Sequence, residues 1–175
     1  MTTGSILLPI IGATLPDGST NNAAARLQRV QGSASAPSPA FVQLLFDAAA
    51  DQMANWTFRV PVNYASSPVA KLLWKANTTS SNTVRWGVRI AAITPADADT
   101  PNEHAFATSN EANGTPNGTE ARRLVETSIT LTNADSLAAG DLVTMQVFRN
   151  ADDAGNDTCT VDAELVALTI EYTTT

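Results

Sequence analysis

Residues that could carry covalent catalysis are scarce in this chain, which has one histidine, His104, and one cysteine, Cys159. A nucleophilic serine or cysteine needs a base beside it. His104 lies in a long polar stretch, whereas Cys159 stands between two threonines in an expected strand, a setting typical of a small buried side chain. We therefore expect no Ser-His-Asp or Cys-His centre, and no spacing typical of a zinc site is present.

Carboxylates are the remaining groups for acid–base chemistry, since the chain has 17 Asp and Glu residues. A glycosidase needs only two of them beside a glycosidic bond. Nothing in the sequence marks such a pair, so a glycan-degrading enzyme is our third hypothesis. We predict that the protein is not an enzyme and that it needs no cofactor.

Asp152, Asp153, Asn156 and Asp157 cluster around a glycine and offer oxygen ligands of the kind that Ca²⁺ accepts. Their spacing does not match an EF-hand loop. Asp, Asn and Gly are also the residues that a tight turn needs for its backbone. Turn chemistry is the favoured interpretation of Asp152–Asp157, and calcium binding stays open.

Aromatic and cationic side chains offer binding instead of catalysis. Trp56 and Trp86 occupy apolar positions of alternating stretches, so we expect them in the core, whereas Trp74 is a candidate sugar-stacking platform. The pair Arg122-Arg123 is a candidate contact for an acidic neighbour, although a solvated strand edge is the favoured interpretation.

Alternation of apolar and polar residues is the dominant pattern among the elements that must position these groups. It runs through Trp56–Val62, Val84–Ile90 and Val125–Leu131, and further strands are expected at Arg26–Val30, Phe41–Ala48 and Val69–Lys75. Successive side chains of a half-buried antiparallel strand point to opposite faces of its sheet. The sequence therefore predicts an all-β protein, an antiparallel β-sandwich or jelly roll, with at most one short helix at Asp47–Met53.

The last third of the chain predicts two long strands, Gly140–Arg149 and Cys159–Tyr172, joined by an acidic turn. We expect them to form a long hairpin that closes the sheet. The apolar residues of the second strand change phase between Leu165 and Val166. Such a change requires a β-bulge or a bend at that point.

Two stretches lie outside this pattern. Thr94–Glu120 is a polar excursion, and a loop of that length is uncommon unless it is functional or packs on a partner. Residues 1–35 contain an apolar hexamer interrupted by a proline, then a turn and a linker, and read as an N-terminal extended arm. We predict a single β-sandwich domain at 36–175. The candidate partner-binding residues of the arm are Ile6, Leu7, Leu8, Ile10 and Ile11.

Charge and hydropathy argue against binding to nucleic acid and against insertion into a membrane. The net charge is −7 and no basic stripe is present, which argues against nucleic acid. The apolar N-terminal run is short, broken by Pro9 and not preceded by positive charge, so we expect neither a signal peptide nor a membrane span.

The C-terminal region resembles the ends of tailed-bacteriophage virion proteins. The resemblance rests on the run Leu-Ala-Ala-Gly-Asp-Leu-Val at Leu137–Val143, on Arg149, on Asp157-Thr158 and on Asp162–Tyr172. Val161 departs from the pattern, since a glycine is common there in the family. The resemblance implies a jelly roll or related β-sandwich of the capsid decoration or tail-associated type, usually a trimer, without catalytic residues.

Two functions follow from these observations. The first is a capsid decoration (cement) protein, a homotrimer that binds and stabilises the major capsid protein shell on the virion exterior after assembly in the host cytoplasm. Its arm would add a strand or an apolar staple to a neighbour. The alternative is a tail or fibre receptor-binding module that recognises host surface glycans through Thr94–Glu120 and an exposed Trp74.

Overall fold

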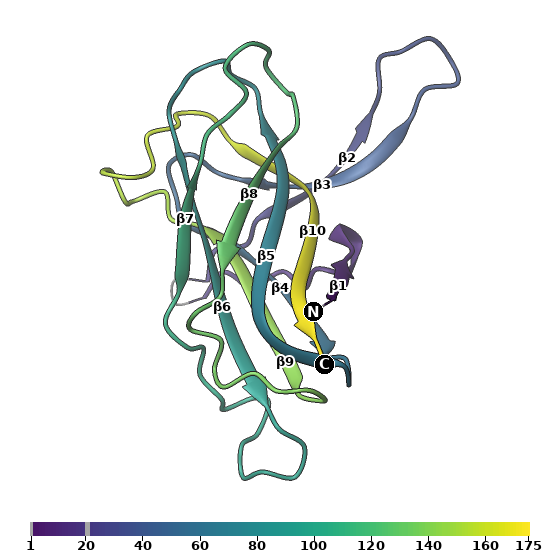
Figure 1. Cartoon of the computed structure of the whole chain (residues 1–175). Helices are drawn as coiled ribbons and strands as arrows, with labels where there is room; N and C mark the ends of the chain where they lie inside the picture. The colour runs from purple at the N-terminus through teal and green to yellow at the C-terminus, as the bar shows by residue number, and fades with distance from the viewer. Residues whose placement is uncertain (1, 20–21) are drawn as a thin grey trace.

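The computed structural model describes residues 2–19 and 22–175 and shows two antiparallel β-sheets packed face to face (Figure 1). The six-stranded sheet contains β1 (Thr3–Leu8), β2 (Arg26–Gln31), β3 (Ala40–Phe46), β5 (Tyr64–Ala76), β8 (Val125–Thr130) and β10 (Ala163–Thr174). The four-stranded sheet contains β4 (Gln52–Arg59), β6 (Val84–Ile93), β7 (Asn110–Gly114) and β9 (Leu142–Arg149). One 3₁₀ turn, η1 (Ile10–Gly12), precedes β2, and no helix in the described ranges is long and apolar enough to cross a membrane. The predicted all-β sandwich is confirmed.

Several neighbours within each sheet are far apart in the chain, such as β1 and β10 or β4 and β9, whereas β2–β3 and β6–β7 are consecutive. The six-stranded sheet runs β2-β3-β10-β5-β8, with β1 also paired to β10, and the four-stranded sheet runs β4-β9-β6-β7. Such crossovers between two sheets are typical of jelly-roll and related sandwiches.

Apolar side chains from the facing surfaces of the two sheets form the core. Trp86 packs edge-on against Trp74, with 5.6 Å between ring centroids, and against Phe46, at 5.0 Å. Trp56 and Trp86 are buried, as predicted. The predicted exposure of Trp74 is wrong, because its side chain is 0% exposed and its indole N–H donates to Thr127 Oγ1 at 2.8 Å. Trp74 follows the inward phase of β5 and is closed to a sugar.

β10 bends where the sequence predicts. Its pairing with β5 slips by one residue between Leu165 and Ala167, which makes Val166 the bulge. Before the bulge, β10 pairs on its other side with β3, and from Leu168 onward it pairs there with β1. The predicted irregularity at Leu165–Val166 is confirmed, and it lets one strand serve two successive neighbours.

The predicted final hairpin is wrong, since β9 and β10 belong to different sheets. The connection between them crosses the edge of the sandwich and is held by a buried ion pair. Arg149 donates from Nε and Nη2 to the two carboxylate oxygens of Asp157, at 2.8 and 2.7 Å, and from Nη1 to the carbonyl of Val161 at 2.9 Å. Backbone carbonyls and one carboxylate therefore satisfy a fully buried guanidinium, which fixes the crossing.

The short helix allowed at Asp47–Met53 does not form. β3 ends at Phe46 and β4 begins at Gln52, and the five residues between them turn the chain from one sheet to the other. The Asp47 carboxylate accepts from the N–H of Ala49 at 2.6 Å, while Gln52 Oε1 accepts from the N–H of Asp47 at 2.9 Å. These side-chain bonds stabilise a turn in place of a helix.

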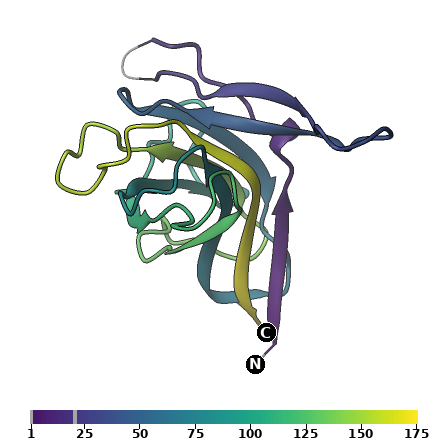
Figure 2. The same ribbon diagram turned by 90° about the horizontal axis from the view of Figure 1, so that it is seen from above.

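The predicted arm lies on its own domain. β1 pairs with β10 along its whole length, so the two chain ends lie side by side (Figure 2). Leu8 and Ile10 are buried in the core and Ile6 packs partly against it, whereas Leu7 and Ile11 are each 67% exposed. β1 and β2 are strands of the same sheet as β3, β5, β8 and β10. The predicted boundary between an arm at 1–35 and a domain at 36–175 stays a prediction. The binding of a partner by these residues stays a prediction.

Candidate binding site

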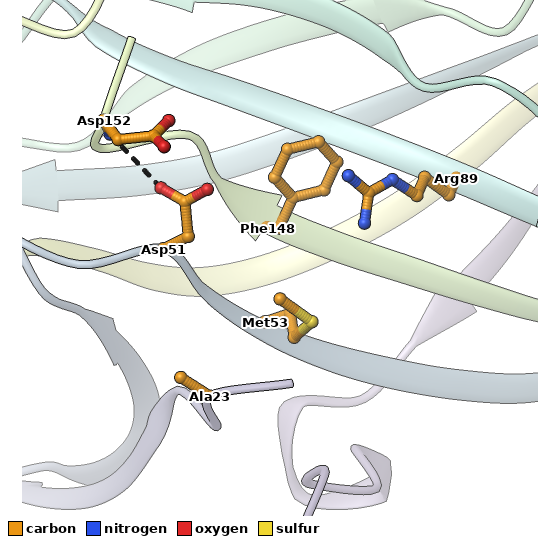
Figure 3. Close-up of a pocket in the computed structure, with 6 residues that line it drawn as sticks. All are labelled: Ala23, Asp51, Met53, Arg89, Phe148 and Asp152. Atoms are coloured by element: carbon orange, nitrogen blue, oxygen red, sulfur yellow. Dashed lines mark hydrogen bonds between the residues drawn. The ribbon is translucent and has the colours of Figure 1, made fainter. Parts of the chain in front are cut away.

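The outer face of the four-stranded sheet, which points away from the core, carries a hollow of about 480 Å³ (Figure 3). Its walls come from three neighbouring strands and two connections. Arg89 lies on β6, Phe148 on β9 and Met53 on β4. Arg89 faces outward because it alternates with the core residues Val88 and Ile90.

The rim of this first hollow is formed by segments outside the sheet. Ala23 comes from the N-terminal segment, which is held beside β4 because the N–H of Met53 donates to the Ala23 carbonyl at 2.9 Å. On the opposite side lie Asp51 and Asp152. The Asp51 carboxylate accepts from the backbone N–H groups of Ala151, at 2.7 Å, and Asp152, at 3.2 Å, and so joins the two loops (Figure 3).

A stacked guanidinium forms the central feature of the hollow. The Arg89 guanidinium carbon lies 4.3 Å from the centroid of the Phe148 ring. Its Nη1 donates to Gln146 Oε1 at 2.9 Å, and Gln146 Nε2 donates to Asn55 Oδ1 at 3.2 Å. A chain of polar groups thus crosses β6, β9 and β4 beneath the surface. Cation–π contact and hydrogen bonding both fix the plane of the guanidinium.

Gly87 makes this stacking possible. The Phe148 ring lies directly over Gly87 on the neighbouring strand, and a Cβ atom built there would lie 2.1 Å from the ring. Any larger residue would push the ring outward into the space that Arg89 occupies. The glycine is therefore required by a close approach between strands.

A second hollow, of about 220 Å³, lies further along the same face. Its floor includes Thr144 of β9 and Ala91 of β6, and it is covered by Pro101, His104 and Phe106. These three residues belong to the predicted polar excursion Thr94–Glu120, which contains β7 and otherwise runs as loop. The excursion therefore shapes the outer face of the four-stranded sheet. The expectation that it is functional or packs on a partner stays a prediction.

His104 anchors the covering loop. Its Nε2 lies 2.6 Å from Asp135 Oδ2, and its Nδ1 lies 3.2 Å from Asp99 Oδ2. Asp135 Oδ2 also accepts from the N–H of Ala92 at 2.8 Å, which ties the loop to β6. The hydrogen bond that His104 donates to Asp135, with further help from the charges of Asp135 and Asp99, raises the pKa of His104 above its ordinary value. These contacts give the histidine a role in holding the loop against the sheet.

The two hollows follow one another along β9. Thr144 and Phe148 are four residues apart and face the same side, a separation of about 13 Å in a strand. The face therefore presents carboxylates, a guanidinium, amides, an aromatic ring and aliphatic groups along one line. Such a mixture orients a hydroxylated ligand by hydrogen bonds and buries its apolar parts.

The acidic turn serves the fold. Asp157 is engaged by Arg149, and its Oδ2 also accepts from the N–H of Arg85 at 2.9 Å. Asp153 Oδ2 accepts from the Asn156 amide at 2.8 Å. Within the described ranges no group of three or more His, Cys, Asp or Glu side chains is arranged to hold a metal ion. Turn chemistry accounts for the contacts of Asp153, Asn156 and Asp157.

Of the residues that line the first hollow, sequence reasoning had singled out only Asp152, as a candidate Ca²⁺ ligand. Met53 and Phe148 are 4% and 2% exposed although both alternate out of phase with the core. The signal was the run Val143–Arg149, in which apolar residues occur in both phases of the strand. A strand that is apolar on both faces indicates that its outer face is also covered.

No family model matches the chain, and no curated protein matches it. Among solved structures, it is similar to a family 35 carbohydrate-binding module from Clostridium thermocellum (9% identity, 95% of this chain and 97% of that chain, TM-score 0.47). It is also similar to CBM27-1 of Caldicellulosiruptor saccharolyticus in complex with mannohexaose (9%, 95% and 96%, 0.46). A third is the K1 cleaved adhesin domain of Lys-gingipain from Porphyromonas gingivalis (13%, 99% and 99%, 0.47).

Proposed function

We propose that the protein is a non-catalytic carbohydrate-binding β-sandwich that holds a neutral sugar chain on the outer face of its four-stranded sheet. The observation that carries this proposal is the first hollow, where a guanidinium stacked on Phe148 faces two carboxylates across an apolar floor. Sugars present hydroxyl groups that both donate and accept, together with apolar C–H faces. The hollow offers a partner to each of these groups.

Neutral sugars suit the charge of the hollow better than acidic ones. Its lining carries the carboxylates of Asp51 and Asp152 and one guanidinium, Arg89, which gives a net charge of −1. A ligand carboxylate would meet like charge there, and the whole chain, with a net charge of −7, would add to the repulsion.

Binding is proposed in place of hydrolysis because Asp51 already has a structural task. Its Oδ1 accepts two backbone N–H groups from the loop that carries Asp152. A glycosidase needs one carboxyl group as a proton donor and another as a nucleophile or base, each free to reach the sugar. A carboxylate that joins two loops is suited to shaping a site.

The test is binding to immobilised neutral polysaccharides, followed by calorimetry with oligosaccharides of the one that retains the protein. Arg89→Met should weaken binding by about tenfold or more, because it removes a charged hydrogen-bond donor while it still covers Phe148. Asp152→Ala should have a smaller effect of the same sign. Arg85→Met is the matched control, since Arg85 lies on the same strand and face but pairs with Glu111 outside the hollow.

Retention of full affinity by Arg89→Met, with its fold intact by circular dichroism, would exclude this face as the binding site. If no neutral polysaccharide retains the wild-type protein, the proposed function fails.

A second candidate is the capsid decoration role, and one observation favours it. Leu7 and Ile11 are exposed on a segment that also forms the strand β1. β1 pairs with β10 on one side, and within the described chain no named strand pairs with its other side. An exposed strand edge beside apolar side chains can add a strand from a neighbouring protein.

Deleting the N-terminal segment is a poor test of that role, because Pro9 accepts a hydrogen bond from the Trp56 indole at 2.9 Å and Leu8 is buried. The double variant Leu7→Asp/Ile11→Asp changes only exposed side chains. It should stay folded and should lose saturable binding to undecorated capsids and any trimer formation. Full decoration by this variant would exclude Leu7 and Ile11 as the capsid contact, whereas no binding of the wild-type protein to undecorated capsids would exclude the decoration role.

A further inference from the structure

The outer face of the six-stranded sheet carries a different recess, near the base of the hairpin formed by β2 and β3 that projects from the sandwich (Figure 1). Its volume is about 570 Å³, and an apolar recess of about 360 Å³ shares Phe41, Lys75 and Arg122 with it. We call the two together the cationic groove. It lies on the opposite sheet from the two hollows described above.

Polar side chains cross the floor of the groove in a row. Gln28 of β2 stands opposite Gln43 of β3, and Glu164 of β10 stands opposite Lys75 of β5. These four strands are consecutive neighbours in the sheet, so the row spans about 14 Å. It is long enough to contact more than one unit of a chain-like ligand.

Charge distinguishes this groove from the rest of the molecule. Its lining carries Arg29, Lys75 and Arg122 against a single carboxylate, Glu164, which gives a net charge of +2 on a chain whose net charge is −7. Lys75 is only 9% exposed and forms an ion pair with Glu164. An anion is attracted to such an isolated positive site, and low exposure strengthens that attraction.

Arg122 and Lys75 are close enough to repel one another. Burial, and after it the charge of Arg122, lower the pKa of Lys75 below its ordinary value. The Arg122 backbone is fixed in the left-handed region, with φ at 65°, and its N–H donates to the carbonyl of Ala76 at 2.8 Å. A carboxylate bound between the two cations would offset both their mutual repulsion and the free-energy cost of burying the charge of Lys75.

Gln43 supplies a polar group that lacks a partner. The side chain is 2% exposed, its Nε2 donates to Gln28 Oε1 at 2.8 Å, and its Oε1 has no hydrogen-bond partner among the residues that the structure describes. Exchanging oxygen and nitrogen in both amides keeps the Gln28–Gln43 bond and leaves the Gln43 nitrogen unpaired instead. A buried amide of this kind is satisfied by a hydroxyl group, which can donate or accept.

We propose that the cationic groove is a second carbohydrate site, selective for an acidic sugar unit. The carboxylate of a uronic acid lies between Arg122 and Lys75, a ring hydroxyl bonds to the Gln43 amide, and the C–H face of the ring packs on Phe41, which is 38% exposed at the rim. The carboxylate matches the charge of the groove, and the hydroxyl matches its unpaired amide. An acidic peptide would supply the first of these but not a hydroxyl at each position.

The experiment compares calorimetric titrations with oligogalacturonates and with the same oligomers as methyl esters. We expect the free acids to bind at least about tenfold more tightly than the esters, because a charged hydrogen bond is lost on esterification. Added salt should weaken binding of the acid and leave the ester unchanged. Poly-glutamate serves as the peptide probe.

Two neighbouring arginines provide matched variants. Arg122→Asn, in which asparagine tolerates a positive φ, should lose about tenfold in affinity for the acid. Arg123→Asn removes the same charge one residue away, from an exposed side chain paired with Glu120, and should bind as the wild type does. Gln43→Met should weaken acid and ester equally, since it removes the hydroxyl partner.

Three outcomes would overturn the proposal. They are equal binding of the acid and the ester, equal loss of affinity in Arg122→Asn and Arg123→Asn, and no binding of either oligomer. Tighter binding of poly-glutamate than of the oligogalacturonate would replace it with a peptide site. Arg89→Met should leave oligogalacturonate binding intact, so failure of the neutral-sugar site and failure of this one are told apart.

Discussion

The outer faces of the two sheets follow the same rule of alternation but present opposite surfaces. On the four-stranded sheet, Phe148 and Met53 line a hollow whose charged groups give a net charge of −1. On the six-stranded sheet, the floor is a row of polar side chains and the net charge of the lining is +2. A sandwich core leaves both outer faces free to differ, since neither face contributes to the packing between the sheets.

The covering segments account for much of this difference. The hollows on the four-stranded sheet are rimmed by the N-terminal segment and by the loop that contains His104. The cationic groove instead lies beside the β2–β3 hairpin, and its rim residue Phe41 is partly exposed. Apolar side chains persist on an outer face where a loop covers it, whereas polar ones are required where it stays open.

The largest expected effect comes from a change that should break both faces together. Arg149→Met removes the fully buried guanidinium that fixes the crossing from β9 to β10 and leaves Asp157 buried without its partner. We expect the free energy of unfolding to fall by about 3–5 kcal/mol, measured by urea denaturation. Binding of neutral and acidic sugars should then disappear at the same urea concentration.

A matched control and a rescue sharpen this prediction. Arg123→Met breaks an exposed ion pair with Glu120 and should cost no more than about 1 kcal/mol. The double variant Arg149→Met/Asp157→Leu should recover part of the loss, because no unpaired charge remains in the core. A loss below about 1 kcal/mol in Arg149→Met would show that the crossing does not depend on the ion pair.

A smaller change should separate the two faces. Gly87→Ala places a methyl group where the Phe148 ring lies and should cost about 1–3 kcal/mol in unfolding free energy. Because the displaced ring disturbs Arg89, neutral-sugar binding should weaken while oligogalacturonate binding is kept, as measured by calorimetry below the melting temperature. Gly118→Ala is the control, since no atom lies within 4 Å of its added Cβ. Equal losses on both faces would contradict their independence.

Local sequence patterns predicted the strands well, because the alternation of apolar and polar residues in a strand depends on residues that are close in the chain. The alternation of Val84–Ile90 and the phase change at Leu165–Val166 both appear in the structure as β6 and as the bulge in β10. The prediction of a β9–β10 hairpin was wrong. Strands that are close in sequence often pair, but the sheet that a strand joins depends on a tertiary contact. That contact is the pairing of Arg149 with Asp157, which the sequence shows only as an arginine before an acidic turn.

The candidate sites were largely hidden from the sequence for the same reason. Trp74 was a candidate sugar-stacking platform, and its position between Leu73 and Lys75 did not show which way it faces; both Trp74 and Lys75 are largely buried. The pair Arg122-Arg123 was a candidate contact for an acidic neighbour, with a solvated strand edge favoured, and the structure places Arg122 with Lys75 in the lining of the cationic groove. The resemblance to virion proteins correctly implied a β-sandwich, and three of the residues that carry it, Asp141, Arg149 and Asp157, are buried. The virion role stays a prediction.

The smallest expected effect is a pH dependence confined to the four-stranded face. His104 has a raised pKa in the folded protein, so the fold binds its proton more tightly than the unfolded chain does. Its contribution to stability is present below the ordinary pKa of 6.5 and is lost as the pH rises through the raised folded value. The groups that face it are Asp135 and Asp99, with Asp97 nearby, all acidic.

Neutral-sugar binding at the second hollow should therefore weaken slightly as the pH rises through the raised pKa of His104, because the covering loop loses a charged anchor. His104→Gln should flatten this profile, and oligogalacturonate binding should show no corresponding step. A step of equal size on both faces would mean that the loop's anchor acts on the whole fold, and the two sites would then have to be treated as coupled.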